Sequence, residues 1–512
     1  MRVCRFAICG GIENTGGMSG DDDAGRLFDA PAVEVVEPVV KASVDKTFRP
    51  YDPHLMFLMP PSIDDWLPEE HLARFVSELV DEVLDLEPFL AVFTEARGFP
   101  PYDPRLMLKI VLYGYTTGVR SSRGIERRCH DDVAFRFLAA NAAPDYRSIA
   151  RFRRRHLVAL AALFVEVLGL CAAAGMVKLG RVALDGSKVR ANASRRKAMS
   201  YKRMTEREAA LQAEVDEMMA DAEATDTAED ERFGPEGRGD DLEGEMARRE
   251  SRLAKIRRAK VDLEAEAKRR AGADAARRSW HASAGRADTA AEDSEAAQAW
   301  ASAAGDDAAG AARPPDKAQR NFTDPDARIM KTSDGSFHYC YNAQTVVDDA
   351  HQVIVATTLT NRSADCPEFA SMLDDIETNC GIRPRQVLAD AGYFSEDNVA
   401  AAALRGVDAL IATGRLKHGE TPPAAPRGRI PKDATAKQRM ARKLRTKAGR
   451  AAYKRRKAII EPVFGQIDTV QGSKKVLLRG EAAANAEWQL LAACHNLRKL
   501  FGNGGTAQIN TG

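Results

Sequence analysis

Three carboxylates stand out from the other acidic residues because of their surroundings. Asp185, in "RVALDGSKVR", and Asp390, in "RQVLADAGYF", each end a short apolar run that predicts a core strand, and a glycine follows within two residues. Glu461 lies in the apolar helical segment "AIIEPVFG". Burying a carboxylate costs several kcal/mol unless a partner or a metal ion compensates its charge.

Carboxylates that face one crevice repel each other unless a cation joins them. Hard divalent ions such as Mg²⁺ take oxygen ligands and also keep waters and phosphate oxygens. Two such ions roughly 4 Å apart activate an attacking oxygen and stabilise a leaving one. The alternative is structural, since a lone aspartate at a strand end is more often a turn or cap residue. Four other aspartates compete for the same role: Asp348, Asp349, Asp365 and Asp397.

A strongly basic segment comes directly before Glu461. The chain has a formal net charge of only +1, yet residues 415–460 contain just two acids, Glu420 and Asp433, among many Lys and Arg. Contacts to phosphates supply most of the non-specific affinity of proteins for DNA. The run "KQRMARKLRTKAGRAAYKRRK" therefore predicts a phosphate-binding surface beside the carboxylates, with a disordered basic linker as the alternative.

The elements that must position these residues form a mixed α/β pattern after Gly180. Strands are predicted at "RVALD", "SFHYCYNAQTVVDD", "HQVIVATTLTN", "RQVLADAG" and "VDALIAT", with helices between the later ones. Ligand crevices of open α/β sheets form at strand ends of this kind. An insertion at 195–320 interrupts the pattern. Its charged segments predict an exposed helical hairpin, and its low-complexity part predicts disorder, without chemistry of its own.

The preceding residues, 46–178, predict an all-α domain. "LPEEHLARFVSELVDEVLDLEPF" has amphipathic helical spacing, and "DPRLMLKIVLYGYTTG" begins with Asp-Pro and ends at glycine. "SSRGIERRCHDDVAFRFLAAN" and "YRSIARFRRRHL" predict two short helices joined by a turn. A helix-turn-helix would bring the arginines of the second helix to DNA, whereas a solvated basic face is the equal alternative. Those arginines are Arg151, Arg153, Arg154 and Arg155.

The length of the chain, 512 residues, is sufficient for two or three domains. Its eight scattered cysteines include no CxxC pair, which predicts reduced thiols and a cytoplasmic protein. "LVALAALFVEVLGLCAAAGM" is long enough to cross a bilayer, but Glu166 in its middle favours a buried core helix and no membrane. Flexible tails are expected at 1–45 and 504–512, and Met18 is an alternative start.

Five segments, in this order, resemble the DDE transposases of bacterial insertion sequences. They are "ALDGSKVRANAS", "GSFHYCYNAQTVVD", "LADAGYFSEDN", "YKRRKAIIEPVFGQI" and "LLAACHNLRKLF". The text from "YDPRLMLKIVLYGYTTGVRSSRG" to "DYRSIARFRRRH" resembles the helical amino-terminal domain of that family. The resemblance implies a ribonuclease H-like catalytic domain at 179–503, interrupted by the insertion, after a DNA-binding domain at 46–178.

The resemblance also implies roles for individual residues. Asp185 matches the first metal-binding aspartate of the family, Asp390 the second, and Glu461 the catalytic glutamate. Near that glutamate the family carries a tyrosine, an arginine and a later lysine that hold DNA phosphates. Tyr453 and Arg456 resemble the first two, although the interval to Glu461 is one residue longer than usual.

Two positions of this phosphate-binding motif depart from the family pattern. Lys457 fits the arginine place by strict count. The late lysine place, seven residues after Glu461, is occupied by Asp468, which puts a negative charge where a phosphate is expected. Lys474 or Lys475 would compensate for this change.

The resemblance implies a metal-dependent transposase that cleaves DNA at the ends of its element and transfers the free 3′-hydroxyl into target DNA. The implied cofactor is Mg²⁺, with Mn²⁺ as a substitute and two ions as the expected number. The implied partners are double-stranded DNA, as terminal inverted repeats and target, and a second copy of the chain in a nucleoid-associated synaptic complex. The alternatives are a catalytically inactive DNA-binding derivative, favoured by Asp468, and an endonuclease of the same fold.

Overall fold

The computed structural model describes residues 62–92, 101–233, 242–284, 312–414, 424 and 428–504. The predicted tail at 1–45 lies outside these residues. So do residues 285–311 of the predicted low-complexity segment and residues 505–512 at the carboxyl end.

A six-stranded mixed sheet carries both predicted aspartates. Its strands are β1 (Arg181–Arg190), β4 (Arg328–Lys331), β5 (Phe337–Asp348), β6 (Ile354–Thr360), β7 (Gln386–Ala389) and β8 (Asp408–Ile411). The strand order is β4-β5-β1-β7-β8, with β6 also paired to β5. β1, β7 and β8 run parallel, while β5 runs antiparallel to β1, β4 and β6. The mixed α/β fold predicted from the sequence is confirmed.

β1 is longer than the sequence pattern predicts. Asp185 lies in the middle of the strand, because the antiparallel pairing with β5 continues from Val182 to Arg190. The parallel pairing with β7 stops earlier, at the pair Leu184–Ala389. The prediction that Asp185 ends its strand is therefore wrong for the ladder with β5, although Asp185 does come directly after the last residue paired to β7.

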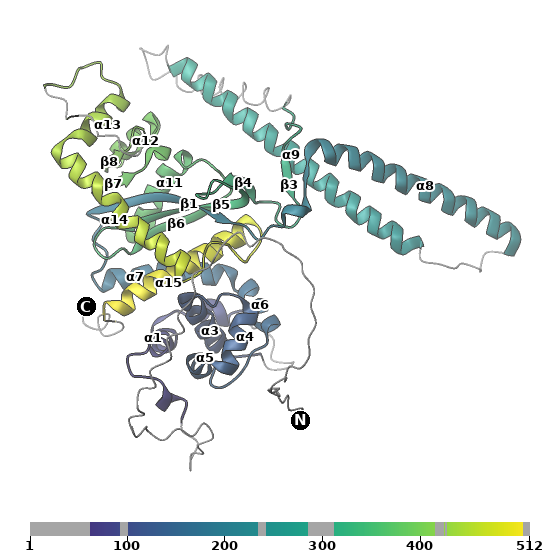
Figure 1. Ribbon diagram of the computed structural model, residues 1–512, viewed down its shortest axis with the longest axis horizontal. Coiled ribbons are helices and arrows are strands. Elements are labelled where there is room, and N and C mark those ends of the chain that lie inside the picture. The colour runs from purple at the N-terminus through teal and green to yellow at the C-terminus, as the bar shows by residue number, and fades with distance from the viewer. Residues whose placement is uncertain are drawn as a thin grey trace, which may run out of the picture. The chain divides into compact units, whose positions relative to one another are not determined.

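Helices cover both faces of the sheet (Figure 1). One face carries α11 (Phe369–Cys380) and α12 (Glu396–Leu404), which are the crossovers between successive parallel strands, and parallel strands require such connections. The other face carries α14 (Lys447–Thr469) and α15 (Glu481–Gly502), and α13 (Ala436–Arg445) precedes α14. A serine caps α12, since the Ser395 hydroxyl accepts a hydrogen bond from the Asn398 amide.

The amino-terminal helices follow the predicted pattern with one correction. They are α1 (Leu72–Glu78), continued by a π-helical turn (Leu79–Val83), α2 (Glu87–Leu90), α3 (Pro104–Thr117), α4 (Ser122–Asp131), α5 (Val133–Leu138), α6 (Tyr146–Arg155) and α7 (Leu157–Ala173). The segment before α6 forms two helices rather than one, because the Asp132 carboxylate accepts from the Ala134 and Phe135 amides and starts α5.

These helices share one hydrophobic core with the sheet, a core that includes Leu108, Val167, Val346 and Leu491. A buried ionic cluster also joins the two regions. The Glu487 carboxylate of α15 accepts from Tyr115 Oη at 3.2 Å and Arg120 Nη1 at 3.3 Å, while its other oxygen accepts from the Leu477 amide at 2.7 Å. Arg153 lies in this cluster, 3.9 Å from Glu487. The domain boundary at 178 stays a prediction.

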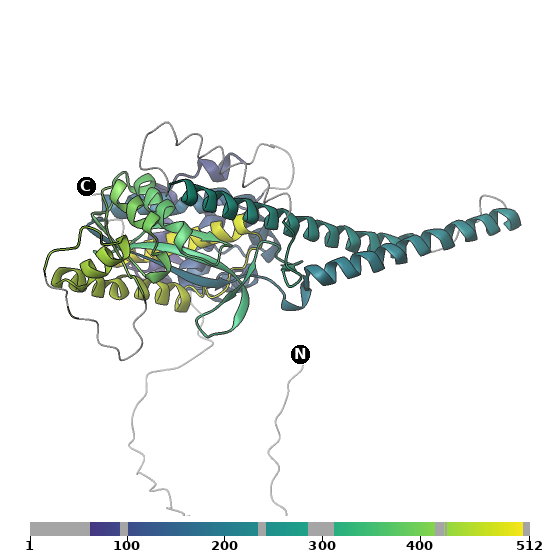
Figure 2. The same ribbon diagram turned by 90° about the horizontal axis from the view of Figure 1, so that it is seen from above.

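The insertion forms the predicted helical hairpin. α8 (Tyr201–Phe233) and α9 (Leu242–Ala284) lie side by side (Figure 1 and Figure 2). At its base β2 (Ala198–Ser200) pairs antiparallel with β3 (Gln319–Asn321). A small cluster of buried apolar side chains holds the two helices together. It includes Met204, Leu211, Ile256 and Leu263.

Within the described ranges, no single helix is long and apolar enough to cross a membrane; α6 and α7 would meet that test only together, and they are bent by 70°. α7 instead buries Leu163, Val167 and Cys171, as predicted for a core helix. The six cysteines of the described ranges are free thiols.

Candidate active site

Asp185 and Asp390 lie next to each other on neighbouring parallel strands. The registered pair Leu184–Ala389 places the two aspartates one residue further along β1 and β7, and parallel strands run about 4.8 Å apart. Asp185 Oδ1 accepts from the Gly186 amide at 2.9 Å, and Asp390 Oδ1 accepts from the Gly392 amide at 2.7 Å. No hydrogen bond of the described residues occupies Asp390 Oδ2, so this oxygen can bind a further partner.

Arg456 of α14 supplies the positive charge that Asp185 needs. Its Nη1 donates to Asp185 Oδ2 at 2.8 Å, and only 13% of the arginine side chain is exposed. Burial raises the pKa of the Asp185 carboxyl above its usual value, Arg456 lowers it in part, and the nearby Asp390 charge raises it again. The carboxylate pair is therefore electrostatically unfavourable by itself and attracts cations.

A third aspartate, Asp365, lies against the glycines of both motifs, Gly186 in β1 and Gly392 after β7. It comes from the loop after β6, and its Oδ1 accepts from three side chains: Lys188 Nζ at 3.0 Å, Asn342 Nδ2 at 2.7 Å and Gln344 Nε2 at 2.8 Å. Gln344 in turn accepts from the hydroxyl of the fully buried Tyr393. The structure thus selects Asp365 from the four competing aspartates as a neighbour of the pair.

The glycines that follow the two aspartates are required by this close packing. A Cβ atom on Gly186 would lie 2.7 Å from both Asp365 Oδ1 and Gln344 Nε2. A Cβ atom on Gly392 would lie 3.0 Å from Asp390 Oδ1 and 3.2 Å from Asp365 Oδ2. Real Cβ atoms do not tolerate the 2.7 Å contacts at Gly186, so glycine there lets Asp365 approach β1.

The remaining competitors have structural roles or lie elsewhere. Asp348 caps a turn, accepting from the Leu179 amide at 2.7 Å and the Ala350 amide at 2.8 Å. Asp349 pairs with Arg455 and, more weakly, with Arg181. Asp397 lies in the first turn of α12.

The polar residues around Asp365 were not predicted, but the sequence contains a signal for them. Asn342 and Gln344 are two residues apart in β5, which buries mostly apolar side chains on both faces. Residues i and i+2 of a strand point to the same face. Two fully buried amides on one face require polar partners, and here they surround Asp365.

Glu461 lies on α14 as predicted, but it contacts neither aspartate. Its carboxylate is 61% exposed and forms an ion pair with Lys457 at 3.8 Å. It comes five residues after Arg456, and at 100° per residue it points about 140° away from the side chain that contacts Asp185. Within the described ranges, no group of three or more His, Cys, Asp or Glu side chains is arranged to hold a metal ion.

The predicted phosphate-binding residues of α14 differ in accessibility. Tyr453 is partly buried, and its hydroxyl donates to the Ala389 carbonyl at 3.3 Å, directly before Asp390. Lys457 is 74% exposed. The unexpected Asp468 accepts from the Ser473 hydroxyl at 2.7 Å, so it holds the loop after α14.

Two other sets of predicted DNA-binding cations are exposed. Lys474 and Lys475 lie in the loop after α14, which runs beside the end of β1, where the Arg190 amide donates to the Lys474 carbonyl at 3.1 Å. On α6 three of the predicted arginines are also exposed: Arg151, Arg154 and Arg155. The expectation that Arg153 belongs to this basic face is wrong, because Arg153 is buried beside Glu487.

Asp185 and Asp390 have the donor chemistry that a divalent cation requires, but Glu461 lies outside the pair, so the arrangement is incomplete. Asp185 and Asp390 provide hard oxygen donors, and Asp390 Oδ2 has no hydrogen bond within the described ranges. A single ion held by two carboxylates, with water or phosphate oxygens completing its coordination, agrees with this donor set.

Comparison with known families gives two matches along the chain. Residues 61–155 match the Transposase domain (DUF772), and residues 312–497 match the Transposase DDE domain. Together the two matches cover more than half of the chain, in the order that the sequence motifs predict. The chain belongs to the insertion-sequence DDE transposases. No curated protein and no solved structure gave a significant match.

Membership of this family explains the architecture of the transposase. Its sheet order, with β5 antiparallel beside a central β1 and two parallel strands on the other side, is a ribonuclease H-like arrangement. The DDE family typically uses divalent metal ions, and its members act on DNA. The second match begins at residue 312, so β1 and Asp185 lie outside it, as does the hairpin.

Proposed function

We propose that this transposase cleaves DNA at the ends of its element and joins the free 3′-hydroxyl to target DNA, with Asp185 and Asp390 as the metal-binding pair. The observation that carries this proposal is the position of the two aspartates, side by side at the point where the β1–β7 pairing ends. Each belongs to a motif of the DDE pattern, and the second lies in the matched DDE domain.

The proposed reaction has two steps, and in each of them one P–O bond forms while another breaks. In the first, a water oxygen forms a bond to the scissile phosphorus while the bond to the 3′-oxygen breaks, which leaves a 3′-hydroxyl and a 5′-phosphate. In the second, that hydroxyl attacks a target phosphodiester, and one P–O bond replaces another. A bound divalent ion, Mg²⁺ or Mn²⁺, would supply Lewis-acid activation of the attacking oxygen and stabilisation of the leaving one.

The side chains around the pair have distinct proposed roles. Arg456 neutralises Asp185 in the absence of a cation, and it can turn to a DNA phosphate once another positive charge engages that carboxylate. Asp365, held by three donors, packs against Gly186 and Gly392 and keeps the segments after the two aspartates in place. Lys457, Lys474 and Lys475 would bind the DNA backbone on the exposed side of the site.

Glu461 is the proposed third acid, and its present position makes a local change necessary. Its carboxylate must separate from Lys457, an ion pair of the exposed kind worth about 0.3–0.5 kcal/mol, and this part of α14 must also turn towards the aspartates. A second metal ion, which DDE chemistry would use, requires that Glu461 join the site. A second copy of the chain is proposed for holding two DNA ends together.

A purified sample tests the role of the pair. Asp390→Asn keeps the shape of the side chain but removes the charge, so we expect loss of metal-dependent cleavage by at least about 100-fold, with DNA affinity within about threefold. The matched control is Asp397→Asn in the first turn of α12, which should cut normally. Full cleavage by the Asp390 variant would disprove the assignment.

The inactive derivative is the second candidate, and the separation of Glu461 from the pair favours it. A wild-type protein that binds terminal repeats but cuts no DNA with either Mg²⁺ or Mn²⁺ would establish this alternative. Strand joining in addition to cutting would instead distinguish the transposase from a plain endonuclease.

A further inference from the structure

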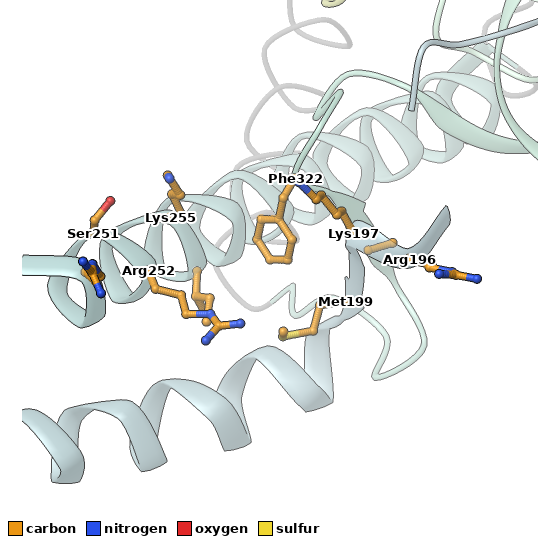
Figure 3. Close-up of a pocket in the computed structure, with 10 residues that line it drawn as sticks. Arg196, Lys197, Met199, Ser251, Arg252, Lys255 and Phe322 are labelled. Carbon is orange, nitrogen blue, oxygen red and sulfur yellow. The ribbon is translucent and has the colours of Figure 1, made fainter. Parts of the chain in front are cut away.

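A basic cavity lies at the base of the hairpin, away from the proposed active site. Its volume is about 580 Å³, and it lies between the start of β2 and the first third of α9. Figure 3 shows Phe322 and Met199 between two groups of basic side chains, one from α9 and one from the segment before β2. The five cations of the wall are Arg196, Lys197, Arg248, Arg252 and Lys255.

The charges in this cavity are not compensated as they are elsewhere on the hairpin. Most nearby cations have acidic partners, such as Lys260 with Glu208 at 2.9 Å and Arg328 with Glu266 at 2.8 Å. In contrast, no acidic residue lines the cavity, and no carboxylate of the described ranges forms an ion pair with any of its five cations. Like charges that converge in this way repel each other and favour an anion between them.

The spacing of the cations on α9 suits a polymer of regularly spaced phosphates. Arg248, Arg252 and Lys255 lie at i, i+4 and i+7, hence on one face of the helix over about 10 Å. Successive phosphates of one DNA strand rise about 3.4 Å each, so this row spans about three of them. Phe322 and Met199 give the floor an apolar surface that suits the sugar faces of a backbone.

The cavity is also within reach of DNA bound at the aspartates. Arg196 comes eleven positions after Asp185, so the chain between them spans at most about 40 Å. One turn of B-DNA is about 34–36 Å long. The loop that carries Lys474 and Lys475 contacts Arg190 at the end of β1, and Arg190 lies between Asp185 and Arg196 in the sequence.

We propose that this cavity, the hairpin groove, binds the phosphate backbone of duplex DNA about one helical turn from the cleaved phosphate. The hairpin would then add affinity without reading sequence. This inference rests on the proposed function for the identity of the anion, but it concerns a separate surface.

The test compares two charge-matched variants of the full chain. Arg252→Glu/Lys255→Glu reverses two charges in the groove, and Arg269→Glu/Arg270→Glu reverses two exposed charges of α9 outside it. Binding of a labelled 40-base-pair duplex is measured by fluorescence anisotropy in EDTA at several salt concentrations. The EDTA prevents cleavage, so the result does not depend on the role of Asp390.

We expect the groove variant to bind at least about tenfold more weakly, with a salt slope smaller by about two, while the control changes less than about twofold. Arg252→Gln/Lys255→Gln repeats the measurement without charge reversal in case the first variant unfolds. Equal losses in both charge-reversed variants would overturn the proposal. So would binding of tripolyphosphate that is lost in the groove variant while duplex affinity is unchanged, because that result assigns the groove to a small anion.

Discussion

The charge of Asp185 depends on opposing contacts with its neighbours. Burial and Asp390 disfavour the ionised carboxylate, whereas Arg456 and the Gly186 amide stabilise it. Asp365 lies close to both Gly186 and Gly392 but is itself held by Lys188. A carboxylate pair balanced in this way binds a cation more readily than a pair already neutralised by several arginines.

Substitution of Gly186 tests this close packing. In Gly186→Ala the new Cβ would displace the Asp365 carboxylate or Gln344, so we expect cleavage to fall by about tenfold or more and stability by about 1–3 kcal/mol. Cleavage assays and urea unfolding measure the two effects. Gly180→Ala is the matched control, since its Cβ would meet no atom within 4 Å. Unchanged activity and stability in the Gly186 variant would contradict the role given to this packing.

At the level of elements, β1 brings the parts of the site together because it has two different neighbours. Its first half pairs with β7, which places the aspartates together, and its second half continues beside β5. This continued pairing carries the strand to the loop with Lys474 and Lys475 and to the base of the hairpin. α14 then crosses β1 and places Arg456 on Asp185.

Removal of the hairpin tests whether the catalytic core folds without it. Ser200 and Gln319 face each other in the β2–β3 register, so an Asn-Gly turn can replace residues 201–318. We expect a folded core with a cooperative thermal transition, because the hairpin has its own apolar cluster. Circular dichroism and limited proteolysis check this result.

The hairpin deletion removes contacts at the base of the hairpin. Arg320 and Arg328 lose Glu266 of α9, Arg320 also loses Asp262, and Phe322 loses its apolar neighbours, so a modest loss of stability is expected. Replacing both arginines by Gln in the shortened chain provides the control for that loss. A molten product in both forms would show that the hairpin is part of the folding core.

For the whole molecule, α15 is the element that joins the amino-terminal helices to the sheet. Glu487 contacts residues of α3 and of the segment before α4, and His495 contacts the β5–β6 turn by donating from Nε2 to the Gln352 carbonyl at 3.0 Å. His495 is fully buried, and burial lowers its pKa to about 4, with the backbone contact raising it and Lys499 and Arg498 lowering it further.

The buried His495 predicts acid sensitivity. The imidazole of a histidine in an unfolded chain has a pKa of about 6.5. Between that pH and about 4, His495 is therefore protonated in the unfolded chain but neutral in the folded protein. Stability is therefore complete above about pH 6.5 and falls as the pH is lowered towards about 4. The loss between pH 7.5 and pH 5 is on the order of 2 kcal/mol.

Urea unfolding at the two pH values measures this effect. In His495→Gln, whose amide can donate to Gln352, the pH-dependent loss should be smaller by that amount. His351→Gln, at an exposed position, should behave as the wild type. Equal pH dependence in all three proteins would show that His495 does not cause the acid sensitivity.

The sequence by itself determined the local structure and the order of the transposase motifs. The helix start at Asp103, the serine cap of α12, the strand before Asp390 and the hairpin helices were all predictable, because caps, glycine stops and hydrophobic spacing act between residues close in the chain. The ribonuclease H-like fold followed from the order of the motifs.

Only the tertiary structure decided which charged groups meet. Asp365 joins the aspartates because the loop after β6 lies over Gly186 and Gly392, and Arg456 reaches Asp185 because α14 crosses β1. Arg153, expected on a basic surface, is buried against Glu487, and Glu461 points away from the pair. Such contacts depend on strand register and on the rotation of a packed helix, and residues more than a hundred positions apart set both.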